Sequence, residues 1–197
     1  MEHSEKALNP EESLRVIRES IDLAKNNLSE NGFQFLLWGW LVVLACTADY
    51  YLAVILQHPK HYMAWLLMVV VGMPVSLIYE WRRDKREPGA RSLIQDWYGR
   101  VWMAFGISLF LVIALVVPAH QSPVPFILVL AGFATFVSGD LLRFRPLQYG
   151  ALAMWAGAGA CLALAPPEHL LVQAAATVLG YLIPGYLLNA KVRQHHV

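Results

Sequence analysis

The sequence predicts an all-α membrane protein, in which six transmembrane helices form three repeated hairpins after a cytoplasmic amphipathic helix. Three observations predict this class. The composition is 57% hydrophobic and only 15% charged, whereas a typical soluble domain is about 25% charged. Apolar stretches of membrane-spanning length recur along the chain. The basic residues fall almost entirely in every second connection between these stretches, which is the pattern of a membrane protein with a fixed orientation.

The first element is a polar segment, residues 1–31, that predicts an amphipathic helix. Asn9 suits the N-cap, Pro10 the first helical position, and Glu12 completes a capping-box pattern. Its apolar residues lie alternately three and four positions apart and form a narrow contact stripe: Leu14, Ile17, Ile21, Ala24 and Leu28. The charged face is acidic rather than rich in Lys and Arg, which disfavours anionic lipid. We therefore expect residues 10–30 to contact the protein's own basic loop, a second copy or another protein.

Six apolar stretches follow, and each is long enough to cross a bilayer, because about 20 helical residues span the hydrocarbon core. They lie at residues 33–55, 62–81, 98–118, 124–142, 148–165 and 169–189. Together they predict a helical bundle over residues 32–191, followed by a cytoplasmic tail at 192–197. Cys46 and Cys161 both fall inside spans, where we expect them to pack as small apolar residues without a disulfide.

The basic residues predict the orientation. When the N-terminus, the loop at 82–91, the turn at 143–145 and the tail are assigned to one side, that side holds every Lys and Arg except Lys60. The positive-inside rule makes it the cytoplasmic side. We therefore expect an inner-membrane protein with both termini in the cytoplasm.

Glycine spacing indicates that one helical hairpin is repeated three times, over about residues 32–83, 98–143 and 149–191. The first, third and fifth spans each carry two glycines seven residues apart near the cytoplasmic end. The pairs are Gly32 and Gly39, Gly99 and Gly106, and Gly150 and Gly157. Residues seven apart lie on one helix face, and small residues let helices approach closely in a membrane. Helix packing is therefore the predicted role, and a hinge or substrate path is the alternative.

One group of residues has the composition of a metal site. Asp49 lies in the outer third of the first span, with no basic residue one helical turn away. Each expected outer loop contains histidine, and the four are His58, His61, His120 and His169. Imidazole and carboxylate bind Zn²⁺, Cu²⁺ and Ni²⁺, so a divalent transition metal is the one cofactor that the sequence suggests. Their spacing matches no metal-binding motif, and a structural role at the interface is the alternative.

The sequence otherwise argues against several function classes. It contains no GxSxG elbow, HExxH, Walker loop or dinucleotide fingerprint, so an enzyme is not expected. No basic patch is interleaved with aromatic residues, which excludes nucleic acid as a predicted partner. The centres of the spans lack Asp, Glu, Lys and Arg, which argues against an ion-coupled transporter. At the cytoplasmic ends, Glu80 and Asp140 precede Arg83 and Arg143 by three residues, a spacing that predicts ion pairs.

The segment "SLRVIRESIDLAKNNLSENGF", which runs into "LLWGWLVVLA", resembles the start of small uncharacterised bacterial membrane proteins of the kind common in Bacteroidetes. The resemblance implies six spans and an inner-membrane location, and it brings no known activity or site residues.

The leading hypothesis is therefore a non-enzymatic membrane scaffold or sensor-like protein that acts through helix packing and its cytoplasmic helix. The alternatives are a small transporter or channel for a poorly charged or lipid-like solute, and a metal-binding or enzymatic site at the outer histidines. A cavity that reaches the membrane midplane would favour transport. Convergence of Asp49 with at least three histidines would favour a metal site. A filled core together with an exposed stripe on residues 14–28 would favour the scaffold.

Overall fold

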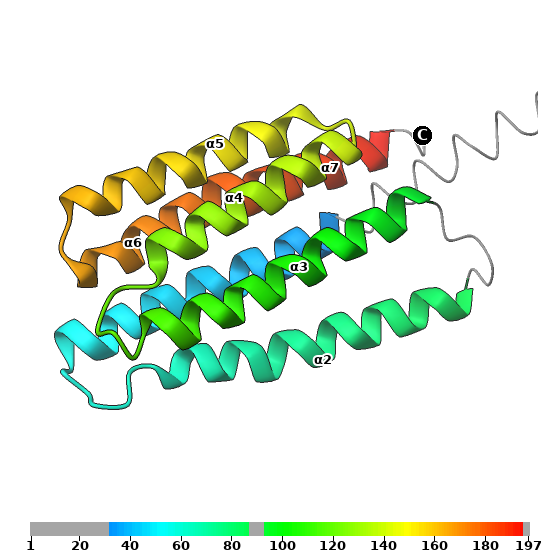
Figure 1. Cartoon of the computed structure of the whole chain (residues 1–197). Helices are drawn as coiled ribbons and strands as arrows, with labels where there is room; N and C mark the ends of the chain where they lie inside the picture. Colours follow the sequence, from blue (N-terminus) through cyan, green and yellow to red (C-terminus); the bar gives the residue numbers. More distant parts are fainter. Residues whose placement is uncertain (1–31, 87–92, 195–197) are drawn as a thin grey trace, which may run out of the picture.

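A computed structural model of the chain describes residues 32–86 and 93–194 (Figure 1). The predicted helix at 10–30, with its apolar stripe, and the last residues of the tail lie outside the described residues. All described secondary structure is helical, and residues 32–86 and 93–194 contain no strand. The all-α prediction is confirmed.

The helices run back and forth between two ends of one bundle (Figure 1). A helix over residues 32–50 continues as the π-helical turn η1 (Tyr51–Ile55). It is followed by α2 (Met63–Arg86), α3 (Leu93–Val116) and α4 (Val124–Leu141). The chain then forms α5 (Arg145–Ala160) with the 3₁₀ turn η2 (Cys161–Ala163). It ends with α6 (Pro166–Thr177), the π-helical η3 (Val178–Leu182) and α7 (Ile183–Gln194), which follow one line.

Five of these helical segments are long and apolar enough to cross a membrane, and they indicate a membrane protein. The segments are Gly32–Ile55, Met63–Arg82, Asp96–Val116, Val124–Leu141 and Pro166–Lys191. The fifth predicted span corresponds to α5, whose 16 residues are fewer than a helix needs to cross by itself. α5 nevertheless runs between the same two ends of the bundle as its neighbours (Figure 1).

The two ends of the bundle differ in charge. The end with the α4–α5 turn and the C-terminal ends of α2 and α7 is called the basic end, and its exposed cations include Arg82, Lys85, Arg143, Arg145 and Lys191. The opposite end is called the histidine end, and its histidines are His58, His61, His120 and His169. This separation follows the sequence pattern from which the orientation was predicted.

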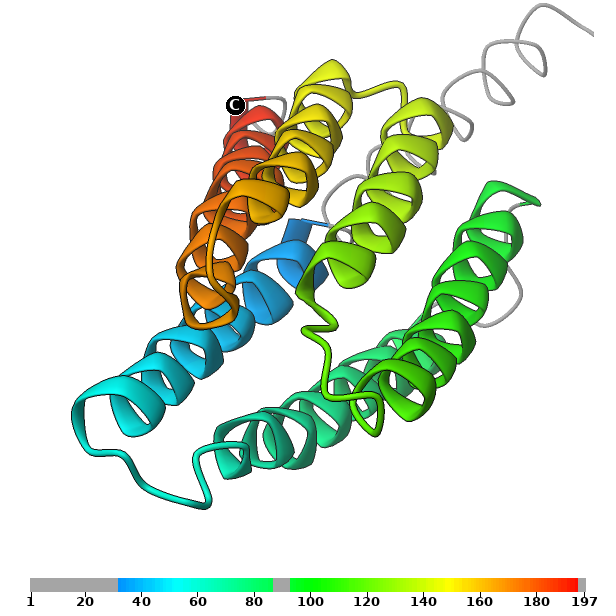
Figure 2. The ribbon, with the colours of Figure 1, turned by 60° about the vertical axis from the view of Figure 1, so that its left-hand side comes forward.

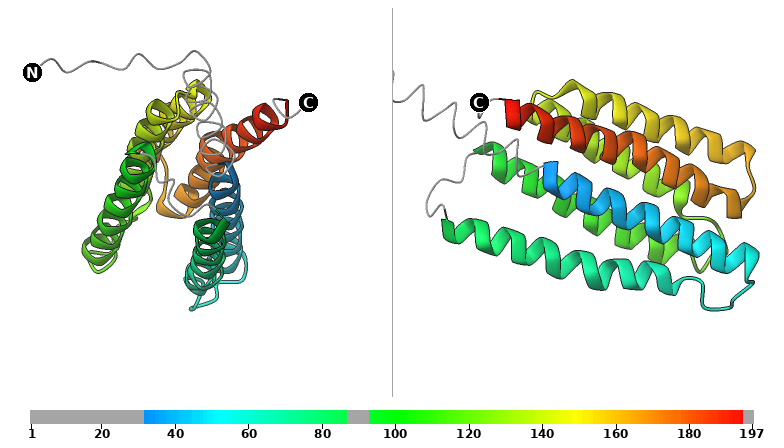
Figure 3. Two further views of the ribbon diagram at one scale, coloured as in Figure 1. Left: turned by 90° about the vertical axis from the view of Figure 1, so that its right-hand side faces the viewer. Right: turned by 180° about the vertical axis from the view of Figure 1, so that it is seen from behind.

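The core lies between the helix at 32–50 and α4 to α7. Its largest fully buried side chains are Phe35, Leu128, Leu147, Met154 and Leu188. α2 and α3 contribute little to it, since 6% and 0% of their most apolar stretches are buried, against 44% for α4. The helix at 32–50 lies beside the line of α6 and α7 (Figure 2). Viewed along the bundle, the helices form two arms that spread apart (Figure 3). One arm contains α2 and the helix at 32–50, and the other contains α3 and α4.

Two of the three predicted glycine pairs lie at close helix contacts. A Cβ atom at Gly39 would lie 2.7 Å from Cδ2 of Leu182, and one at Gly150 would lie 2.8 Å from Cα of Gly180. Both distances are shorter than real Cβ contacts. At Gly150 the two helices therefore pack backbone to backbone, whereas at Gly39 the neighbouring helix places the side chains of Leu182 and Tyr181 against the glycine.

The third pair is different, because Gly99 and Gly106 of α3 have no neighbouring atom within 4 Å of a Cβ atom placed there. Among the described residues, this face of α3 has no partner helix. The three copies of the glycine pattern are therefore not used in the same way.

Candidate functional site

Asp49 lies at the histidine end, near the last turn of the helix at 32–50. Only 6% of its surface is exposed, and among the side chains that the structure describes it is the only buried carboxylate. A buried carboxylate is costly unless donors reach both of its oxygens. The residues around Asp49 therefore decide what it does.

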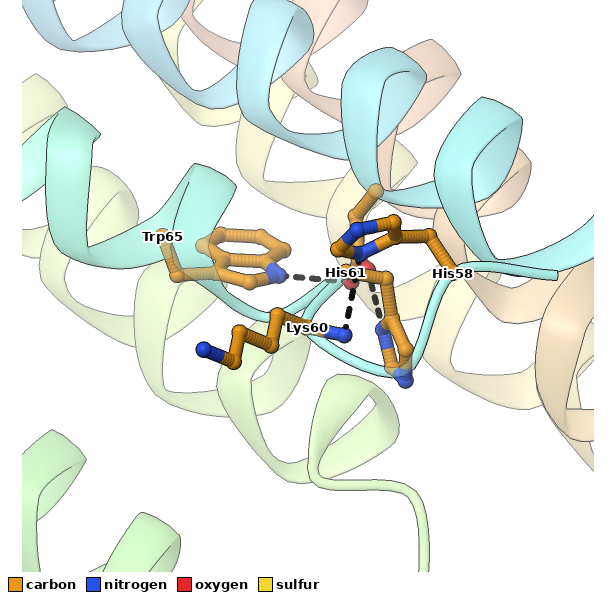
Figure 4. A network of polar contacts seen from close by, with 5 residues as sticks. His58, Lys60, His61 and Trp65 are labelled. Atoms are coloured by element: carbon orange, nitrogen blue, oxygen red, sulfur yellow. Dashed lines mark hydrogen bonds and ion pairs between the residues drawn. The ribbon is translucent and has the colours of Figure 1, made fainter. Parts of the chain in front are cut away.

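Both carboxylate oxygens of Asp49 accept hydrogen bonds from the segment that starts α2 (Figure 4). Nδ1 of His61 lies 2.6 Å from Oδ1, and Nε1 of Trp65 donates to Oδ2 at 2.8 Å. An ionised carboxylate only accepts, so Nδ1 of His61 carries the proton in this contact. Asp49, His61 and Trp65 are called the Asp49 clasp, because they join the tips of the first two helices.

The loop before α2 is shaped to bring His61 to Asp49. The π-helical turn ends where the N–H of Leu56 donates to the carbonyl of Tyr51, and Gln57 then takes a left-handed φ of 48°. The N–H of Lys60 donates to Nδ1 of His58 at 3.1 Å (Figure 4). This turn reverses the chain within a few residues, so that the side chain of His61 faces back to the helix that it follows.

The clasp leaves one ring nitrogen of His61 available. If Nδ1–H donates to Asp49, Nε2 of the neutral ring carries a lone pair. The His61 side chain is 43% exposed, so this atom can accept a proton or bind a metal ion from outside, with Asp49 orienting the ring. No hydrogen bond joins Nε2 to a Ser, Thr or Cys among residues 32–86 and 93–194, and Cys46, one turn before Asp49, is fully buried. The described surroundings therefore offer no nucleophile for His61 to activate.

The other predicted histidines do not join this contact. His58 is exposed and its Nδ1 is occupied by Lys60, and His120 is exposed in the connection between α3 and α4, with a φ of 57°. His169 is buried in α6, where Nε2 lies 2.9 Å from the carbonyl of Cys161. In the described part of the chain, no three His, Cys, Asp or Glu side chains are grouped to hold a metal ion. The structure thus gathers only Asp49 and His61 of the five predicted ligands.

Two residues of the polar structure at this end were not predicted. Trp65 lies four residues after His61, and Gln173 lies four residues after His169. Such spacing places His169 and Gln173 on one face of α6, and this signal could have identified Gln173. His61 lies in the turn before α2, so no helical spacing relates it to Trp65. Gln173 is 3% exposed, and its Oε1 atom and Nδ1 of His169 are buried without a hydrogen-bond partner among the described residues.

At the basic end, the ion pair predicted between Asp140 and Arg143 does not form, and this prediction was wrong. α4 ends at Leu141, and Arg143 takes a left-handed φ of 49°. Helical spacing therefore no longer applies between the two side chains, and no ion pair joins them. The corresponding pair of Glu80 and Arg83 cannot be compared, because the side chain of Arg83 is not among those described.

Comparisons of the chain with protein-family models, with curated proteins and with solved structures found no match. Its function is therefore argued from its own geometry.

Proposed function

We propose that the chain is an integral membrane scaffold or sensor-like protein that acts through helix packing and through the helix predicted at residues 10–30. In this proposal it crosses a bacterial inner membrane six times, as three repeated hairpins of the predicted family type. The basic end and both termini then lie in the cytoplasm, as the positive-inside rule requires. The observation that carries the proposal is the filled interior of the bundle.

Aromatic and aliphatic side chains fill the space where the helices meet. The ring of Phe35 lies 5.8 Å from that of Trp102 and 5.5 Å from that of Tyr181, so three separate helices are joined by one aromatic cluster. Polar groups beside it are satisfied in place, since Thr135 Oγ1 donates to the carbonyl of Ala131 at 2.7 Å. Trp102 Nε1 donates to Ser138 Oγ at 3.2 Å. An interior of this kind supports a rigid scaffold.

The first hairpin supports the same role, because α2 is fastened to the helix at 32–50 by polar contacts along its length. The Asp49 clasp holds one end. Nearer the basic end, Trp38 Nε1 donates to Ser76 Oγ at 3.2 Å, and the rings of Phe33 and Tyr79 stack at 4.2 Å. The outer face of α2 remains apolar and exposed, as does α3 with its open glycine pair. The exposed faces of α2 and α3 thus offer apolar contact surfaces within the bilayer.

Photo-cross-linking of the full-length protein in its native membrane tests this role. A photoreactive residue is placed at Ile21, on the predicted stripe, and the matched control is placed at Glu19, on the opposite helix face. A scaffold that uses the stripe gives one discrete adduct with a second copy or another protein from position 21 and none from position 19. Equal labelling at both positions, together with solute uptake by proteoliposomes that contain the protein, would favour the transport alternative instead.

A metal-binding or proton-accepting role is the second candidate, because one observation favours it. His61, whose side chain is 43% exposed and whose ring is oriented by a buried carboxylate, has the arrangement that proteins use to position a metal-ligating histidine. Metal analysis of the purified protein tests this candidate. The hollow between α4 and α5 lies at the basic end and therefore gives no support to transport through the midplane.

A further inference from the structure

A hollow of about 340 Å³ lies at the basic end, in the turn between α4 and α5. Its volume is near the lower limit of small-molecule sites, which span about 300–1,000 Å³. The residues that line it combine both signs of charge with an apolar ring: Gly139, Asp140, Arg143, Phe144, Arg145 and Gln148. The ligand that fits such a lining is small and polar and carries charge.

Arg143 occupies a backbone position at which glycine would be more stable. The N–H of Phe144 donates to the carbonyl of Gly139 at 2.8 Å, and the N–H of Arg143 donates to that of Asp140 at 3.0 Å. These bonds end α4 with Arg143 at a φ of 49°, in the left-handed region where helix ends usually place glycine. An arginine that is kept at a strained position points to a use for its side chain.

The charged side chains that line the hollow do not form ion pairs with one another. No ion pair with a described carboxylate involves Arg143 or Arg145, and all three charged residues of the lining are exposed. Phe144 is buried to 6% exposure beneath them, with Nζ of Lys191 5.7 Å from its ring centroid. Two guanidinium groups and one carboxylate thus surround a space that they do not fill.

We infer that this hollow binds the headgroup of phosphatidylethanolamine, with Arg143 and Arg145 holding the phosphate and Asp140 accepting hydrogen bonds from the ammonium group. Guanidinium binds phosphate by paired, charge-assisted hydrogen bonds. A carboxylate beside them disfavours a second negative charge and favours a headgroup with a cation next to its phosphate. The inference rests on the membrane placement proposed above, which puts the basic end at the level of the headgroups.

Lipid titration of the purified full-length protein, followed by native mass spectrometry, tests the site. Phosphatidylethanolamine is compared with phosphatidylcholine, which has the same net charge but no N–H donor. We expect the wild type to bind phosphatidylethanolamine about tenfold more tightly, a difference of about 1.4 kcal/mol. Asp140→Asn should abolish this preference and leave phosphate binding intact.

The variant Arg143→Gly distinguishes an effect on lipid binding from an effect on the stability of the fold. Glycine relieves the left-handed backbone, so the unfolding temperature should stay the same or rise, whereas binding of both lipids should fall about tenfold. The matched control is Arg82→Ala, which removes an exposed cation of the basic end outside the hollow and should leave binding unchanged.

Three results would overturn the inference. Equal loss of binding in Arg82→Ala would show general attraction of lipid to a basic surface. Tighter binding of phosphatidylglycerol, unaffected by Asp140→Asn, would show a site for anionic headgroups. Displacement of the lipid by millimolar inorganic phosphate would show a site for free phosphate. None of these results would remove the scaffold proposal, which depends on the packed interior of the bundle and on residues 10–30.

Discussion

Asp49→Asn should destabilise the protein, because the clasp depends on a carboxylate with two acceptor oxygens. An amide keeps the shape but has one acceptor, so one of the two donors, His61 or Trp65, loses its partner and meets an N–H group. The hydrogen bond from Nε1 of Trp65, a mostly buried side chain, to the charged Oδ2 atom of Asp49 contributes about 1.5–2 kcal/mol. The bond from His61, whose side chain is 43% exposed, contributes only about 0.5–1 kcal/mol. Since one of these two bonds is lost, we expect a loss of about 0.5–2 kcal/mol in the free energy of unfolding.

For a chain of this size, such a loss corresponds to an unfolding temperature lower by roughly 1–8 °C, at about 2–4 °C per kcal/mol. Circular dichroism of the detergent-purified protein measures the shift, and protease cleavage in the loop at 56–62 reports whether the hairpin tip opens. Trp65→Phe keeps the ring and removes the donor, and a double-mutant cycle with Asp49→Asn should show a coupling of about 1 kcal/mol or more.

The matched control is Thr47→Ala. Thr47 lies on the same helix two residues before Asp49 but is exposed, and its hydroxyl donates to carbonyls of its own helix at Val43 and Leu44. Its replacement should change neither the unfolding temperature nor the cleavage rate. If Asp49→Asn unfolds at the wild-type temperature and its loop resists protease as well as the control, the clasp does not stabilise the hairpin and the reasoning is refuted.

Three further predictions follow from single contacts. Gly150→Ala should reduce the free energy of unfolding by about 1–3 kcal/mol and so lower the unfolding temperature, because the new methyl group would overpack against the backbone of Gly180. Gly106→Ala has open space around it and should be neutral or stabilising. Equal changes in unfolding temperature in the two variants would contradict the packing argument. Elemental analysis should find less than one zinc, copper or nickel ion per chain, because the described part of the site offers only two ligands; a stoichiometric metal that is lost in His61→Ala would make the histidine end a metal site. Gln173→Met removes a buried oxygen that has no hydrogen-bond partner among the described residues, so it should raise the free energy of unfolding by about 1 kcal/mol or more and the unfolding temperature with it. A lower unfolding temperature would indicate that Oε1 of Gln173 has a partner such as bound water.

The helices could be predicted from the sequence because bilayer thickness fixes how long an apolar stretch must be. The second span was expected at 62–81, and α2 runs over Met63–Arg86. The chain continues as a helix past its apolar part because four of the five residues at 82–86 are Arg or Lys, which are good helix formers. Boundaries set by a turn were harder to predict. Arg143 leaves the helix in a left-handed conformation, which nothing in its residue type signals.

The contacts between helices could be predicted only in part. Glycines seven residues apart show where a backbone can approach closely, and Gly39 and Gly150 are used in this way. The same pattern at Gly99 and Gly106 shows that such a pattern does not establish that a neighbour is present. The histidines illustrate the same limit, because their positions in loops fix the end of the bundle but not the distances across it. Only His61, which follows the tight turn after η1, reaches Asp49.

The account depends most directly on six membrane crossings with the basic end in the cytoplasm, and α5 is the crossing that the helix lengths alone do not establish. Single cysteines are introduced at Glu168 and at Arg145, on the two sides of α5, in a chain whose Cys46 and Cys161 are replaced by alanine. Intact bacterial spheroplasts are then treated with a membrane-impermeant maleimide. We predict that position 168 is labelled from outside and that position 145 is labelled only after the membrane is permeabilised. Labelling of both positions from the same side would show that α5 does not cross the membrane and would contradict the six-span account.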